Sequence, residues 1–154
     1  MIDISFDCKI DFRKKDVSGF ITKSVSSILR ILKNKEKDFY ISILLTNNKK
    51  IRKINSKYRS IDKETNVLSF VQNEERMIDK PKNYLILGDI VISLEKIVSE
   101  AEQQNKIFWD HLSHMLIHSI LHLLGYDHEN LKDATVMEKK ERDIFIKLAK
   151  EKIL

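Results

Sequence analysis

The feature that most constrains this chain is a cluster of histidines in its C-terminal third. All five histidines lie within an eighteen-residue segment, at positions His111, His114, His118, His122 and His128. The first four are spaced by three, four and four residues, so they fall on one stripe of a single α-helix. Gly125 follows, and it can end that helix in a left-handed conformation. The segment therefore predicts a helix over about 106–124, with a turn that brings His128 back toward it.

Geometry limits which of these histidines can share one metal ion. A helix rises about 1.5 Å per residue, which separates His114 from His122 by roughly 12 Å along the axis. A Zn–N bond is only about 2.0–2.1 Å long, so one ion can bind a pair of histidines one turn apart. His128 lies three residues beyond Gly125 and is positioned to return toward the last turn. The spacing H-x3-H-x5-H therefore predicts one Zn²⁺ held by His118, His122 and His128.

Three neutral imidazoles would leave the fourth position of a tetrahedral zinc open, as in catalytic sites. Such an ion lowers the pKa of its bound water to about 7. The single cysteine, Cys8, is far away in the sequence, which argues against a closed thiolate site. The alternative is that the histidines are ordinary helix residues, and we favour the metal. For His111 and His114 we favour ordinary polar roles over contacts with substrate or proton transfer, because nothing local assigns them a function.

The hydrophobic pattern predicts an α+β fold. Apolar runs and alternation predict strands over 2–6, 39–45, 67–71 and 84–92, and helical spacing predicts helices over 17–32, 47–58, 93–105, 106–124 and 131–150. This order predicts one small, mixed four-stranded sheet flanked by about five helices, with the zinc site at a helix and the turn that follows. Gly88 falls inside the fourth strand, as a bulge or a point of close approach. The charged segment 72–83 is predicted to be a loop.

The bulk properties predict one globular, cytoplasmic domain over residues 1–154. The length suits one domain, and no linker or repeat interrupts the chain. Hydrophobic residues make up 42% and charged residues 33%, which excludes a disordered or membrane-embedded chain. The N-terminus alternates like a strand and does not resemble a signal peptide, and one cysteine permits no internal disulfide. The net charge of +5 suits nucleic acid, but the lysine-rich composition gives this argument little weight.

The histidine segment resembles the signature of a known family. Residues 118–128 read HSILHLLGYDH, which is similar to the H-G-x-L-H-L-x-G-Y-D-H of the YbeY family of bacterial endoribonucleases. NSKYR at 55–59 with TNVLSF at 65–70, LGDIVIS at 87–93, and Met137-Glu138 with Glu141 resemble three further segments of that family. The departures are Ser60 and Ser119 in place of glycines, Asn66 in place of aspartate, and Glu64 where proline is common.

This resemblance implies a function that the histidines alone do not. It implies a zinc-dependent, single-strand-specific endoribonuclease that acts in maturation of the 16S rRNA 3′ end and in late-stage quality control of the 70S ribosome. The implied partners are the 16S rRNA precursor and the small ribosomal subunit, with no membrane and no DNA. Arg59 alone would be read as a surface residue that ends a helix, whereas the resemblance implies a catalytic guanidinium that pairs with phosphate.

Several roles stay open at the level of sequence. Asp127 can orient a ligand histidine or cap the turn. A basic run can guide RNA or can be a solvated helix face, and it comprises Lys49, Lys50, Arg52, Lys53 and Lys57. No general base stands out, so zinc hydroxide or the 2′-hydroxyl of RNA can be the nucleophile. A zinc peptidase would carry glutamate after its first histidine, where this chain has Ser119. A non-catalytic ribosome-assembly factor is the third alternative.

Overall fold

The computed structural model describes residues 1–32, 38–72 and 84–151. In chain order the elements are β1 (Ile2–Phe6), α1 (Lys14–Ile31), β2 (Asp38–Thr46), α2 (Asn48–Arg59), β3 (Val67–Val71), β4 (Tyr84–Ser93), α3 (Leu94–Gln103), α4 (Phe108–Leu123) and α5 (Leu131–Lys150). This confirms the predicted order of elements. The predicted loop at 72–83 lies outside the described residues except for its first position.

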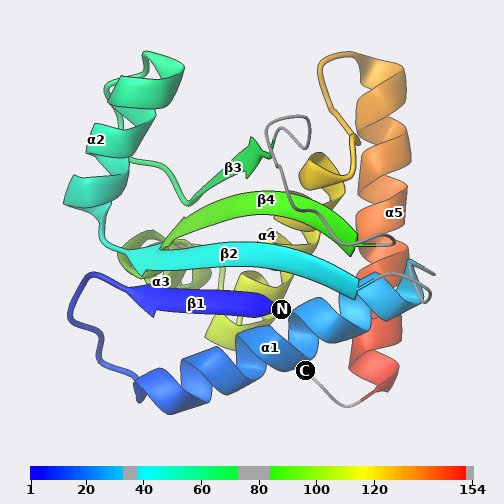
Figure 1. The fold of residues 1–154 in the computed structure, drawn as a ribbon, viewed down its shortest axis with the longest axis horizontal. Coiled ribbons are helices and arrows are strands. Elements are labelled where there is room, and N and C mark those ends of the chain that lie inside the picture. Colours follow the sequence, from blue (N-terminus) through cyan, green and yellow to red (C-terminus); the bar gives the residue numbers. More distant parts are fainter. Residues whose placement is uncertain (33–37, 73–83, 152–154) are drawn as a thin grey trace.

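The four strands form one mixed sheet in the order β1-β2-β4-β3 (Figure 1). Strands β1, β2 and β4 run parallel, and β3 pairs antiparallel with β4 at one edge. The predicted α+β class with a mixed four-stranded sheet is therefore confirmed. Because β3 is an edge strand, one side of its backbone is not paired within the sheet.

Alternation along the strands distributes the apolar side chains over two faces. Ile41 and Ile43 of β2 are fully buried in the main core, which also contains residues of α1, α3, α4 and α5. Leu44 faces the opposite side of the sheet. It packs in a smaller cluster with Ile51 of α2 and Val91 of β4. Four helices therefore cover one face of the sheet, and α2 covers the other. Among the described residues, no helix is both long and apolar enough to span a bilayer.

Gly88 marks a bulge in β4, as predicted. Tyr40 pairs with Ile86 and Ile41 pairs with Gly88, so Leu87 is an extra residue in β4. The φ of Gly88 is +136°, and a Cβ atom there would collide with the backbone oxygen of Phe70 in β3. Only glycine allows the two strands to approach this closely.

Gly125 ends α4 in the predicted left-handed conformation, with φ of +99°. Its N–H donates to the carbonyl of His122 at 3.0 Å, and the N–H of Tyr126 donates to the carbonyl of Leu121 at 3.0 Å. This pair of bonds is the Schellman arrangement, which turns the chain sharply while satisfying the last carbonyls of the helix. The turn carries the chain toward α5, where the side chain of Asn130 caps the helix by accepting from the N–H of Asp133.

Candidate metal centre

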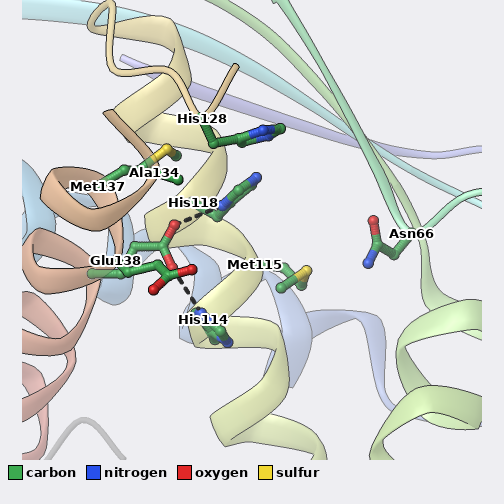
Figure 2. Close-up of a pocket in the computed structure, with 9 residues that line it drawn as sticks. Asn66, His114, Met115, His118, His128, Ala134, Met137 and Glu138 are labelled. Atoms are coloured by element: carbon green, nitrogen blue, oxygen red, sulfur yellow. Dashed lines mark hydrogen bonds and ion pairs between the residues drawn. The ribbon is translucent and has the colours of Figure 1, made fainter. Parts of the chain in front are cut away.

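The three predicted ligands come together at the C-terminal end of α4. His118 and His122 lie one turn apart on that helix, and His128 follows the turn at Gly125. One ligand atom from each side chain lies within 4.8 Å of the others. The ring centroids of His118 and His122 are 4.5 Å apart, and that of His128 is 5.6 and 4.9 Å from them. Figure 2 shows the rings of His118 and His128 stacked on each other, opposite Asn66.

The protonation of the two helix histidines is set by their hydrogen bonds. His118 Nδ1 is 2.7 Å from Glu141 Oε1, and His122 Nδ1 is 3.0 Å from the backbone oxygen of Tyr126. An ionised carboxylate and a carbonyl only accept hydrogen bonds, so each Nδ1 carries the proton. In the neutral rings each Nε2 then has a lone pair, and the two Nε2 atoms lie 3.0 Å apart. Burial is the largest cause that lowers the pKa of His122, and the nearby His118 and His128 lower it further. The lowered pKa favours the neutral form of this ring.

Glu141 of α5 bridges two histidines of α4. Its Oε1 accepts from His118, and its Oε2 lies 3.0 Å from His114 Nε2. Figure 2 marks both contacts with dashed lines that start at the labelled His118 and His114. The Glu141 side chain is largely buried, with residue exposure of only 9%. Burial alone would raise the pKa of Glu141, but the hydrogen bonds from His114 and His118 outweigh it and lower this pKa to about 2. The carboxylate is therefore charged at neutral pH and orients His118.

The carboxylate that orients a ligand is thus Glu141, a role the sequence reasoning did not assign. Asp127 instead accepts a hydrogen bond from the backbone N–H of His128 at 2.7 Å, which matches the turn-capping alternative. One signal was available in the sequence: position 141 falls on the apolar stripe of α5, with Met137 and Ile144. A carboxylate in a buried stripe requires a polar partner.

His111 and His114 take hydrogen bonds within the protein, as expected for ordinary polar groups. His111 is only 3% exposed, and its Nε2 lies 3.3 Å from Glu100 Oε1. The same Glu100 accepts a hydrogen bond at 3.1 Å from the amide of Asn66, the residue that stands where the resembled signature has aspartate. His114 differs from His111 in that its partner, Glu141, also holds a candidate ligand.

Arg59 lines the same cavity as the three histidines. This cavity has a volume of about 820 Å³ and lies between α4, the edge strand β3 and the end of α2. The guanidinium donates to the backbone oxygen of Ser69 at 2.6 Å and lies 5.3 Å from the centre of the Phe70 ring. A second cavity of about 350 Å³ adjoins His114, His118 and His128.

The donor set fits a divalent transition metal. With both rings neutral, the Nε2 lone pairs of His118 and His122 face each other at 3.0 Å, an arrangement that a cation or a shared proton between the rings stabilises. Zinc accepts imidazole nitrogens as ligands, and three such ligands leave a coordination position for solvent or substrate. The exposed side of the cluster faces the larger cavity, so that position is accessible.

Comparison with known proteins identifies the family of this chain. The family model described as Endoribonuclease YbeY matches residues 5–149. The chain belongs to the YbeY family of endoribonucleases. The Endoribonuclease YbeY of Bartonella quintana is 48% identical over 109 residues, covering 71% of this chain and 68% of that protein. The Endoribonuclease YbeY of Bartonella henselae is 43% identical over 136 residues, covering 88% and 85%.

A solved structure supports the YbeY-like fold. The solution structure of TM1509 from Thermotoga maritima matches with a TM-score of 0.65 and 26% identity, covering 98% of this chain and 91% of that chain. Endoribonucleases are hydrolytic nucleases, so membership of the YbeY family confirms the predicted class of enzyme. The three histidines fall within the matched residues.

Proposed function

We propose that this chain is a zinc-dependent, single-strand-specific endoribonuclease of the cytoplasm, folded as a single domain. Its proposed role is maturation of the 16S rRNA 3′ end and late-stage quality control of the 70S ribosome. Its substrates and partners would be single-stranded RNA, the 16S rRNA precursor and the small ribosomal subunit, with no membrane or DNA. One observation carries the proposal: His118, His122 and His128 converge beside a cavity that Arg59 also lines.

The three histidines would hold one Zn²⁺, with Glu141 and the carbonyl of Tyr126 fixing the rings of His118 and His122. When bound, zinc supplies a water of lowered pKa and polarises a phosphoryl oxygen. The charge of Glu141 stabilises a proton on His118 Nδ1, which keeps Nε2 available as a ligand. The hydrogen bond from His114 holds Glu141 in the orientation that this requires.

Arg59 is the proposed catalytic residue for phosphate binding. A guanidinium stays charged at every physiological pH and pairs with phosphate through two parallel hydrogen bonds. Its bond to Ser69 at the edge of β3 uses one of its five donors, which leaves the others for a substrate in the cavity. Arg59 would bind the phosphate whose charge increases as the P–O bond breaks.

The residue after the first ligand argues against the peptidase alternative. Zinc peptidases with H-E-x-x-H activate water with a glutamate at that position. Ser119 occupies it here and is fully buried, so its side chain does not face the larger cavity. The acids that line this cavity include Glu64, which is paired with Lys96 at 3.2 Å, and Asp127, which caps the turn.

Cleavage assays with matched substrates test the proposal. Zinc-loaded protein should cleave a single-stranded 16S rRNA 3′ precursor, while the same sequence in a duplex and an unstructured peptide stay intact. A chelator should abolish cleavage, and added zinc should restore it. His118→Ala should lose cleavage even with excess zinc. Undiminished cleavage by that variant contradicts the proposal. Ribosome maturation in cells supported by a variant that no longer cleaves would favour the non-catalytic assembly factor.

A further inference from the structure

On its α2 side, the rim of the larger cavity includes Arg59 and Ile61, and these are joined by the contacting side chains of Lys57, Tyr58 and Phe70. We propose that this rim, formed by Lys57, Tyr58, Arg59, Ile61 and Phe70, binds a nucleobase of single-stranded RNA beside the metal centre. We call these five residues the aromatic rim. The proposal rests on the proposed function, because it assigns a substrate-binding surface to the same site.

Tyr58 supplies a ring that is both exposed and held in place. Its residue exposure is 61%, and its ring contacts the edge of Phe70 with centroids 5.6 Å apart. Ile61, three positions later, is 50% exposed and adds a second apolar side chain to the rim. An aromatic ring that is positioned before binding loses little conformational freedom when a base stacks on it.

Cations flank the two rings of the aromatic rim. Lys57 Nζ lies 5.1 Å from the centre of the Tyr58 ring, and the Arg59 guanidinium lies 5.3 Å from that of Phe70. Within the described residues, neither cation forms an ion pair with a carboxylate. Arg52, earlier on the same helix, is by contrast paired with Asp62 at 2.8 Å. Cations that form no ion pair in the described part of the chain, next to the exposed ring of Tyr58, match the phosphates and bases of a single strand.

The aromatic rim is continuous with the candidate metal centre. Arg59 and Ile61 line the cavity that contains His118, His122 and His128. The guanidinium of Arg59 reaches the outer edge of β3 through its bond to Ser69, so it connects the rim to the cavity. A strand whose phosphate lies near Arg59 can therefore place a flanking base on Tyr58. A duplex cannot do so, because its bases are paired and stacked inside the helix. The rim would thus favour single-stranded RNA.

The test measures binding by the zinc-loaded protein. A single-stranded RNA containing the fluorescent base 2-aminopurine is mixed in a stopped-flow instrument, so that binding is recorded before cleavage. Tyr58→Ala should weaken binding by roughly 5- to 150-fold, the range for loss of one base–aromatic stack. Tyr58→Phe should keep both the affinity and the fluorescence quenching. Tyr58→Leu should behave like Tyr58→Ala, since it is apolar but has no π face.

Two controls separate stacking from other effects. Ile146→Ala removes a comparably exposed apolar side chain from α5 and should bind like the wild type. Binding of duplex RNA should be the same for Tyr58→Ala and the wild type. The proposed role of the aromatic rim is wrong if Tyr58→Ala binds like the wild type, if Tyr58→Leu keeps full affinity, or if duplex RNA shows an equal loss. It is also wrong if the wild type binds no single-stranded RNA. Wild-type protein that binds without cutting contradicts the proposed function alone.

Discussion

The Nε2 atoms of His118 and His122 lie 3.0 Å apart, although hydrogen bonds to Glu141 and Tyr126 place the proton of each neutral ring on Nδ1. Two lone pairs therefore face each other at the end of α4. Such an arrangement is stable when a cation or a shared proton lies between the rings. His128 adds a third imidazole on the side of the cavity, and this geometry is the basis for the metal site that we propose.

Glu141→Gln should weaken zinc binding by about 10- to 100-fold, the usual effect of losing a group that orients a ligand. The amide keeps the size of the side chain but lacks the charge that stabilises the proton on His118 Nδ1. Zinc affinity is measured by competition with a chelator of known affinity. Glu138→Gln is the matched control, because this exposed residue lies on the same helix and has no hydrogen bond to a histidine among the described residues. Equal zinc affinities for the two variants would refute the role of Glu141.

Arg59→Ala should reduce the rate of RNA cleavage by about 10²- to 10³-fold, the range for loss of one group that stabilises charge in the transition state. Zinc content should not change, since Arg59 is not a candidate ligand. Arg52→Ala removes the same charge from α2 at a residue that pairs with Asp62, and it should cleave RNA nearly as well as the wild type. Cleavage lost to the same degree in both variants would mean that only the charge of α2 matters.

Much of the fold was predictable because local patterns and packing agree. Two helices were predicted to begin at Asn47 and Ser93, and each of these residues caps the helix that follows it. Helix α1 begins three residues before its predicted start at Val17, at Lys14, because the polar first turn carries no apolar periodicity. The order of the strands in the sheet was not predictable from pattern, since it depends on contacts between residues far apart in the sequence.

The metal ligands were predictable because they lie close together in the sequence. The residue that orients one of them was not. His118, His122 and His128 lie within eleven residues, so helix geometry and one glycine turn determine their arrangement. Glu141 lies on another helix, and its bond to His118 depends on how α4 packs against α5. Arg59 reaches the cavity only because β3 is an edge strand, which no periodicity in its sequence reveals.

Ser60→Gly should stabilise the protein by about 1 kcal/mol, which corresponds to a rise in melting temperature of about 2–4 °C for a domain of this size. Ser60 ends α2 with φ of +58°, a left-handed conformation that glycine adopts without strain. The family resemblance also places glycine at this position. Ser56→Gly, in the exposed interior of the same helix, should instead destabilise by about 0.5 kcal/mol. Thermal unfolding of both variants checks the opposite signs.

Gly88→Ala should destabilise the protein by about 3 kcal/mol or more, because the new Cβ would collide with the backbone of Phe70. Gly125→Ala has the milder expected cost of about 1 kcal/mol. Nothing lies within 4 Å of a Cβ there, so only the positive φ opposes the substitution. Urea unfolding gives both free energies. Similar values for the two variants would contradict the close approach of β3 and β4 at Gly88.

The zinc content of the purified chain, measured by mass spectrometry of the metal for the wild type and a matched set of variants, shows whether the three histidines hold the ion. We expect one zinc ion per wild-type chain, and loss of that ion in His118→Ala, His122→Ala and His128→Ala. His111→Ala, which alters a histidine of α4 outside the cluster, should retain it. A full zinc ion retained by the three ligand variants, or a wild-type chain that binds no zinc when the metal is supplied, would contradict a zinc site at these histidines.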